Sequence, residues 1–208
     1  MGRSVTVTGF GHASGTYDQA TLRLAAAARA ANPGDATARA TYAMAAMREV
    51  ILRGGIEEAA LATTNISLSP VHDPWPTVVA YEATLGLAVK VRDLTSIGSL
   101  LVSAVESGGD GARVDGIEFT HRDPASLHNA ARDSAFADAL SKAQQFAGLA
   151  GQALGEVRHV VEGGAAMPSP RGRVMMAMAD SSGGAPIDAG EGTINAIVTV
   201  TWALGPAV

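Results

Sequence analysis

The chain of 208 residues contains no cysteine. This absence excludes disulfide bonds, thiolate nucleophiles, cysteine-ligated zinc and iron–sulfur clusters. Aromatic residues are also scarce, at 4% of the chain, although 47% of it is hydrophobic. Because alanine supplies much of that hydrophobic content, we expect a core of aliphatic side chains and closely approaching backbones.

Positive charge and long apolar runs are lacking as well. The chain has 15 lysine and arginine residues against 20 aspartate and glutamate residues, a net charge of −5. Nucleic-acid binding needs clustered positive charge, so nucleic acid is excluded as the main partner. No stretch approaches the roughly 18 consecutive apolar residues of a membrane-spanning helix. The opening MGRSVTVTG lacks a secretory signal pattern. We therefore expect a cytoplasmic protein, or a periplasmic or cell-envelope protein if a leader has been removed.

Hydrophobic periodicity divides the chain into ten elements. Period-two alternation predicts strands at residues 4–8, 17–24, 63–71, 81–91, 114–119, 156–162 and 193–204. Helical spacing predicts three helices, with Asp35, Asp93 and Asp123 as their N-caps. The order ββαββαβαββ indicates an α+β fold, in which helices pack on one face of mostly antiparallel sheet. We expect one domain over residues 1–208, with a Pro/Met/Ala/Gly-rich insert at about 164–192.

Alternation also predicts which side chains face the core. In the third strand we expect Ile66 and Leu68 to point inward. In the closing strand, six residues share one face: Ile194, Ala196, Val198, Val200, Trp202 and Leu204. The segment GFGHASG, residues 9–15, invites comparison with a dinucleotide-binding loop, but its glycine spacing differs and an alternating segment follows it instead of a helix. It predicts a glycine-rich turn that joins the first two strands as a hairpin.

No arrangement of residues predicts a catalytic, cofactor or metal site. The histidines are His12, His72, His121, His128 and His159. None of them forms the metal-binding H-E-x-x-H motif, and the G-x-S-x-G, Walker A and S-x-x-K motifs are also missing. His121, Asp123 and His128 come nearest to a constellation, but Asp123 is needed to cap a helix. We predict a protein that is not an enzyme; a hydrolase using His72 or His121 is the remaining enzymatic hypothesis.

Two features are candidates for contact with other molecules. Trp75 lies between two prolines in HDPWP, where it either folds back onto the core or is offered to a partner. Met175, Met176 and Met178 lie in RVMMAMA within the insert. Thioethers could bind Cu(I), contact another subunit or pack on the protein's own sheet. Adjacent Met175 and Met176 cannot point the same way on a strand, so we expect packing against a neighbouring subunit or the protein's own sheet.

Taken in order, several segments resemble one known family. They are SVTVTGFGHASGTYDQATLRL, TTNISLSPV, YEATLGLAVKVRDLTSIGSLLVSAVESG, DPASLHNAARDSAFADALSKAQQFAGLAG and the closing TVTW. Their order and spacing resemble the SIMPL-domain family, which includes bacterial periplasmic immunogenic proteins and a vertebrate kinase-associated adaptor. The resemblance implies an α+β fold and ring- or channel-like homo-oligomers, loosely linked to envelope integrity and stress tolerance. It supplies no catalytic residues.

The leading functional hypothesis is accordingly a non-enzymatic, self-assembling scaffold that also contacts other proteins. Its contacts would use backbone edges, the HDPWP loop and the methionine-containing insert. The alternative is a small-ligand or Cu(I)-binding module that uses the methionines of the insert. The missing signal peptide is a departure from the bacterial members of the family that the chain resembles.

Overall fold

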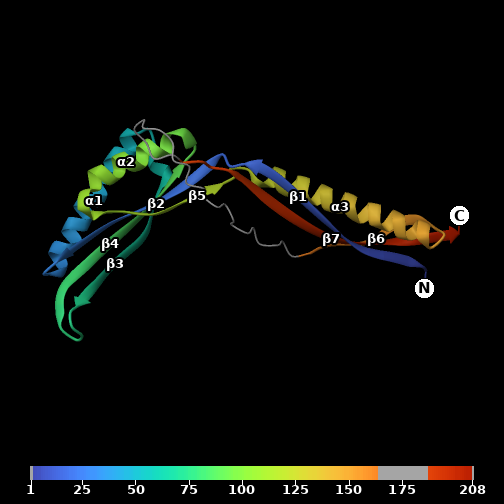
Figure 1. Ribbon diagram of the computed structural model, residues 1–208, viewed down its shortest axis with the longest axis horizontal. Helices are drawn as coiled ribbons and strands as arrows, with labels where there is room; N and C mark the ends of the chain where they lie inside the picture. Colours follow the sequence, from blue (N-terminus) through green and yellow to red (C-terminus); the bar gives the residue numbers. More distant parts are fainter. Residues whose placement is uncertain (1, 164–186, 208) are drawn as a thin grey trace. The chain divides into compact units, whose positions relative to one another are not determined.

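The computed structural model describes residues 2–163 and 187–207, and it confirms the α+β fold and the order ββαββαβαββ (Figure 1). The strands are β1 (Ser4–Thr16), β2 (Gln19–Ala30), β3 (Leu61–His72), β4 (Val78–Val91), β5 (Ala112–Thr120), β6 (Gln152–Glu162) and β7 (Glu191–Ala207). The helices are α1 (Pro33–Arg53), α2 (Ile97–Gly108) and α3 (Pro124–Leu149). None of these helices is long and apolar enough to cross a membrane.

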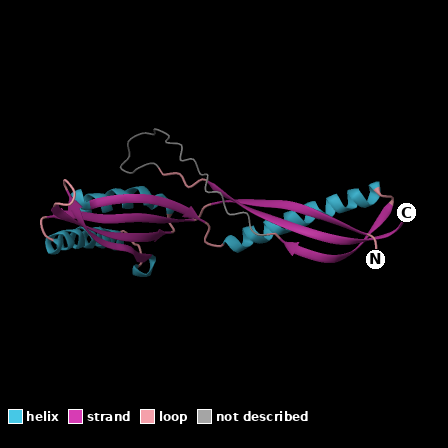
Figure 2. Ribbon diagram, turned by 90° about the horizontal axis from the view of Figure 1, so that it is seen from below, coloured by secondary structure: helices cyan, strands magenta, loops and turns pink. Residues whose placement is uncertain are grey.

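The strands form two antiparallel sheets in two compact units. The first unit contains a three-stranded sheet in the order β1-β7-β6 with α3, and the second contains a four-stranded sheet in the order β3-β4-β2-β5 with α1 and α2. Most of the second unit is the continuous segment Tyr17–Thr120. Figure 2 shows that within each unit the helices run along one face of the sheet, as the sequence predicted.

The first unit is held together by a helix that carries alanine on its inner face. Asp123 caps α3 as predicted, because its side chain accepts a hydrogen bond from the Ala125 N–H at 3.1 Å. Five alanines spaced four residues apart are buried: Ala131, Ala135, Ala139, Ala143 and Ala147. The first four of them pack against β7, where the predicted inward face is confirmed by the buried side chains of Ala196, Val198, Val200 and Trp202.

The glycines of β1 let α3 approach the strand closely. A Cβ built at Gly9 would lie 2.1 Å from the Ala135 carbonyl oxygen, and one at Gly11 would lie 2.2 Å from that of Ala131. The turn and hairpin predicted for residues 9–15 are therefore wrong. These residues continue β1, which pairs with β7, whereas β2 pairs with β4 and β5. The glycines are needed for close packing and not for a change of chain direction.

The second unit buries a larger aliphatic core between its sheet and two helices. Its buried residues are Ala20, Leu22, Leu24 and Ala26 of β2; Leu87, Val89 and Val91 of β4; Met47 and Ile51 of α1; and Ile97, Leu100 and Ala104 of α2. The cap of α1 is Asn32, whose side chain accepts from the Asp35 N–H at 2.8 Å, so the cap predicted at Asp35 is wrong. Pro33 at the first helical position explains the earlier start. Ile187, near the end of the expected insert, packs against this core.

The outer strand of this sheet departs from the predicted burial. Ile66 and Leu68 lie opposite Leu85 and Ala83 in register, so they share the face that α1 covers on β4. However, α1 packs over β2 and β4, and the side chains of Ile66 and Leu68 remain 73% and 49% exposed. The prediction that they point into the core is wrong, because the helix does not extend over β3.

Candidate functional site

Sheet edges are the features of this fold most open to contact. An edge strand presents unpaired backbone N–H and C=O groups, and proteins protect such edges by charge, bulges or covering elements. In the described residues four strands lie at sheet edges: β1 and β6 in the first unit, and β3 and β5 in the second. The protection of each edge can therefore be compared.

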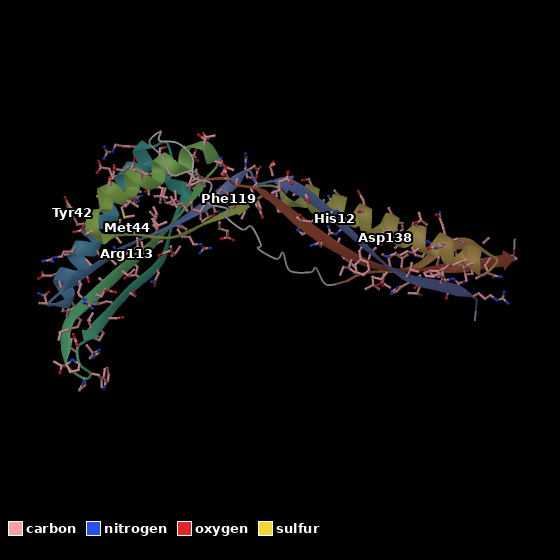
Figure 3. The ribbon with its side chains drawn as sticks, in the orientation of Figure 1. His12, Tyr42, Met44, Arg113, Phe119 and Asp138 are labelled. Carbon is pink, nitrogen blue, oxygen red and sulfur yellow. The ribbon has the colours of Figure 1, made fainter. Side chains whose placement is uncertain are left out.

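The edge of β1 is capped by two side chains of α3. The Lys142 ammonium donates to the Thr8 carbonyl oxygen at 3.1 Å, and the Asp138 carboxylate accepts from the Phe10 N–H at 2.8 Å. Lys142 also pairs with Asp138 at 2.6 Å and lies 4.9 Å from the centre of the Phe10 ring. Figure 3 shows Asp138 on α3 alongside β1. Two backbone groups of this edge are thus already bonded within the chain.

These contacts make the stability that Asp138 contributes dependent on pH. The hydrogen bond from Lys142, followed by that from the Phe10 N–H, lowers the pKa of Asp138. A carboxyl whose pKa is lowered by folding stabilises the protein above its unfolded pKa of about 3.9. That stabilisation is lost as the pH falls through the lower pKa of the folded state.

Replacement of Asp138 by asparagine is expected to destabilise the protein at pH 7 and to reduce its loss of stability in acid. The asparagine carries no charge to pair with Lys142, so the difference in stability between the variant and the original chain should shrink as the pH falls through the lowered pKa of Asp138. Thermal unfolding at pH 7, 5, 4, 3 and 2 measures this. Lys142→Met should act in the same direction because it removes the main cause of the lowered pKa. Parallel acid curves for all three proteins would contradict the assignment.

The edges of β5 and β6 are protected by charge. On β5 the charged residues are Arg113, Asp115 and Glu118, and Glu118 pairs with Arg23 at 2.7 Å. On β6 they are Glu156, Arg158 and Glu162, and Glu162 pairs with Arg132 at 2.7 Å. Charged side chains on an edge strand disfavour pairing with another strand.

Among these four edges, β3 alone carries neither charge nor cap. From Leu61 to Val71 it contains no Asp, Glu, Lys or Arg, and residues 62–70 are all exposed. Ile66 and Leu68 add large apolar side chains to this surface. An uncharged, exposed edge of this length is a surface on which another strand can add by backbone hydrogen bonds.

The loop between β3 and β4 extends this exposed surface. The Trp75 side chain is 77% exposed, and its ring centre lies 4.4 Å from that of His72. Backbone hydrogen bonds from Asp73 N–H to the Thr77 carbonyl and from Thr77 N–H to the Pro74 carbonyl close the loop at 3.1 and 2.9 Å. Trp75 is therefore not folded onto the core, and contact with a partner stays a prediction for it.

The other residues singled out in the sequence do not gather into a site. The His, Asp and Glu side chains of residues 2–163 and 187–207 form no group of three or more that could hold a metal ion. His12 and His159 lie exposed on β1 and β6, and the His72 ring lies tilted against that of Trp75. Met175, Met176 and Met178 lie outside the described residues. The contact of Asp138 and Lys142 with β1 was not predicted, because its only local signal in the sequence is their i, i+4 spacing.

Comparison of the sequence with those of known proteins identifies the family of this chain. A family model described as SIMPL, protein of unknown function (DUF541), matches residues 5–202. The 26 kDa periplasmic immunogenic proteins of Brucella melitensis and Brucella abortus are each 31% identical over 215 residues, covering 95% of this chain and 83% of each relative. Both relatives are named as periplasmic, which overturns the expected cytoplasmic location and points to the periplasm. The chain belongs to the SIMPL family, as its segments indicated.

Proposed function

We propose that this chain is a non-enzymatic scaffold of the bacterial periplasm that assembles from copies of itself. The observation that carries the proposal is the uncharged, uncapped edge of β3. The other three edges of the described chain are capped or charged. The bulge at Thr64 and the proline at position 70 limit the open part of β3 to residues 65–69, and this uncharged, exposed edge segment is best explained if another chain covers it.

Exposed apolar side chains on the same hairpin support assembly. Five apolar side chains have about half or more of their surface exposed: Ile66 and Leu68 on β3, Trp75 in the loop, and Val78 and Val79 at the start of β4. Apolar surface of this kind is favourably removed from water when chains associate. The periplasmic names of the Brucella relatives support the location, and a role in envelope integrity or stress tolerance belongs to the same proposal.

The structural contacts of the polar residues that could act in catalysis support a role that is not enzymatic. Asp123, the central member of the nearest constellation, caps α3. Asp138, whose pKa is lowered, accepts a hydrogen bond from the β1 edge through its carboxylate. The His72 ring packs at a tilt against the exposed Trp75. Each of these side chains has a structural task, which favours a scaffold over a hydrolase.

Native mass spectrometry of the full chain tests the proposal. At micromolar concentration we expect species at multiples of the 21.0 kDa chain mass. Light scattering under the same conditions should give a matching mass, which excludes assembly in the gas phase. A clean 21.0 kDa monomer in both measurements would overturn the proposal.

A further inference from the structure

The open edge of β3 contains one short segment suited to regular pairing. Thr63 lies opposite Leu87 and Asn65 opposite Gly86, so the intervening Thr64 is a bulge with no partner residue. At the other end, Pro70 has no N–H to donate. Residues 65–69 are thus the regular, proline-free part of the edge. Five residues is a usual length for a paired strand, and the middle residue is Ser67.

The two faces of this segment differ in polarity. Ile66 and Leu68 lie on the face that α1 covers elsewhere in the sheet. Because side chains alternate along a strand, Asn65, Ser67 and Ser69 lie on the opposite face. Any strand that continues the sheet must therefore present apolar groups on one face and hydroxyl or amide groups on the other.

A second copy of the same segment meets this requirement. Antiparallel pairing about Ser67 sets Ile66 opposite Leu68 of the second copy and Asn65 opposite its Ser69, while Ser67 lies opposite itself. Apolar groups meet apolar groups on one face, and polar groups meet polar groups on the other. No charge faces a like charge, because the segment has none. The edges of β5 and β6 would instead bring charged side chains against it, and the edge of β1 is capped.

We propose that β3 pairs with β3 of a second copy, antiparallel, about a two-fold axis at Ser67. This inference rests on the proposed self-assembly and names the contact through which it occurs. The pairing joins two four-stranded sheets into one continuous sheet, with α1 of both copies on the same face. It is an isologous contact, in which the same residues are used on both sides.

Disulfide formation at Ser67 tests this register. The natural chain has no cysteine, so Ser67→Cys gives each copy a single thiol. Directly opposed residues of antiparallel strands have Cα atoms about 4.5–5.5 Å apart, within the range that a disulfide bridges. Mild oxidation of the full-length variant should convert most of it to a covalent dimer, seen on non-reducing gels and reversed by a reducing agent.

Ser69→Cys is the matched control on the same exposed face of β3. In the proposed pairing, residue 69 lies opposite residue 65, so the two Ser69→Cys thiols are four residues apart along the strands, roughly 13 Å. We expect at least about tenfold less covalent dimer than with Ser67→Cys, because this separation exceeds disulfide geometry. Mixing Asn65→Cys with Ser69→Cys should restore cross-linking, specifically between the two variants.

The results distinguish a failure of the proposed β3 pairing from a failure of the proposed self-assembly. If the unmodified chain assembles but Ser67→Cys links no better than Ser69→Cys, the β3 pairing is wrong and the proposed self-assembly stands. If the unmodified chain is a monomer, both the pairing and the self-assembly are wrong.

Ser67→Lys supplies an independent measurement, because it sets two like charges opposite each other. It should lower the native mass while circular dichroism shows that the fold is retained, whereas Ser67→Thr should keep the mass. An unchanged mass for Ser67→Lys would also overturn the pairing.

Discussion

Replacement of Gly11 by alanine is expected to destabilise the first unit by at least about 3 kcal/mol, at or beyond the upper end of the usual cost of overpacking. The added Cβ would lie 2.2 Å from both the Ala131 carbonyl oxygen and the Ala135 backbone nitrogen. These are backbone atoms of α3, so no side chain can rotate away to make room. The helix must move off the sheet, and its buried alanines then lose their contacts.

Denaturant unfolding followed by circular dichroism measures this loss. Gly148→Ala on α3 is the control, because a Cβ there meets nothing within 4 Å and its stability should stay within about 1 kcal/mol of the original. Gly108→Ala gives an intermediate case, since its added Cβ would meet side-chain atoms only: Met47 at 2.7 Å and the Ala112 Cβ at 2.9 Å. If Gly11→Ala proved as stable as Gly148→Ala, the close approach of α3 to β1 would be wrong.

Replacement of Trp202 by alanine is expected to cost about 3–5 kcal/mol, the range for removal of a large buried aromatic side chain. Trp202 is 2% exposed and lies in the middle of the three-stranded sheet, opposite Val5 on β1 and Val157 on β6. Its ring centre is 6.0 Å from that of Phe136 on α3. The substitution would leave a cavity at the contact between the sheet and its helix, and thermal unfolding should show a lower midpoint.

The second tryptophan supplies the control, since the chain has two. Trp75→Ala removes an exposed side chain, and a surface substitution of this kind is expected to change stability by no more than about 0.5 kcal/mol. The fluorescence of each single-tryptophan protein reports the environment of the residue that remains. Emission of Trp202 at the wavelength of free tryptophan, or equal losses of stability for both variants, would contradict the burial of Trp202.

The order of elements was predictable because it depends on local periodicity. Alternation and helical spacing are properties of short segments, and they identified every strand and α-helix in the part of the chain that the structure describes. They also identified the inward face of β7, because that strand lies in the middle of its sheet with α3 over one face. The family could be assigned for the same reason, since each segment that resembles it is a short, continuous piece of the sequence.

The errors concern contacts between residues distant in sequence. A glycine pair that permits a turn and one that admits a helix look alike in the sequence, and the helix that contacts Gly9 and Gly11 begins more than a hundred residues later. Alternation gave the face on which Ile66 lies but not how far α1 extends over that face. The i, i+4 spacing of Asp138 and Lys142 is compatible with an ion pair on a helix, but it says nothing of their bonds to β1, which only the fold reveals. The candidate edge itself became recognisable only when the strand order was known.

The pairing of β1 with β7 also dictates the order in which the protein is completed. Its register sets Ser4 opposite Ala203, so the first strand of the chain pairs with the last. The segment Tyr17–Thr120 contains the whole four-stranded sheet and its two helices, so that sheet forms from strands within one continuous segment. Until β7 arrives, the 13 residues of β1 have no strand to join, and contacts across such a separation form slowly. The first sheet is therefore the last to close.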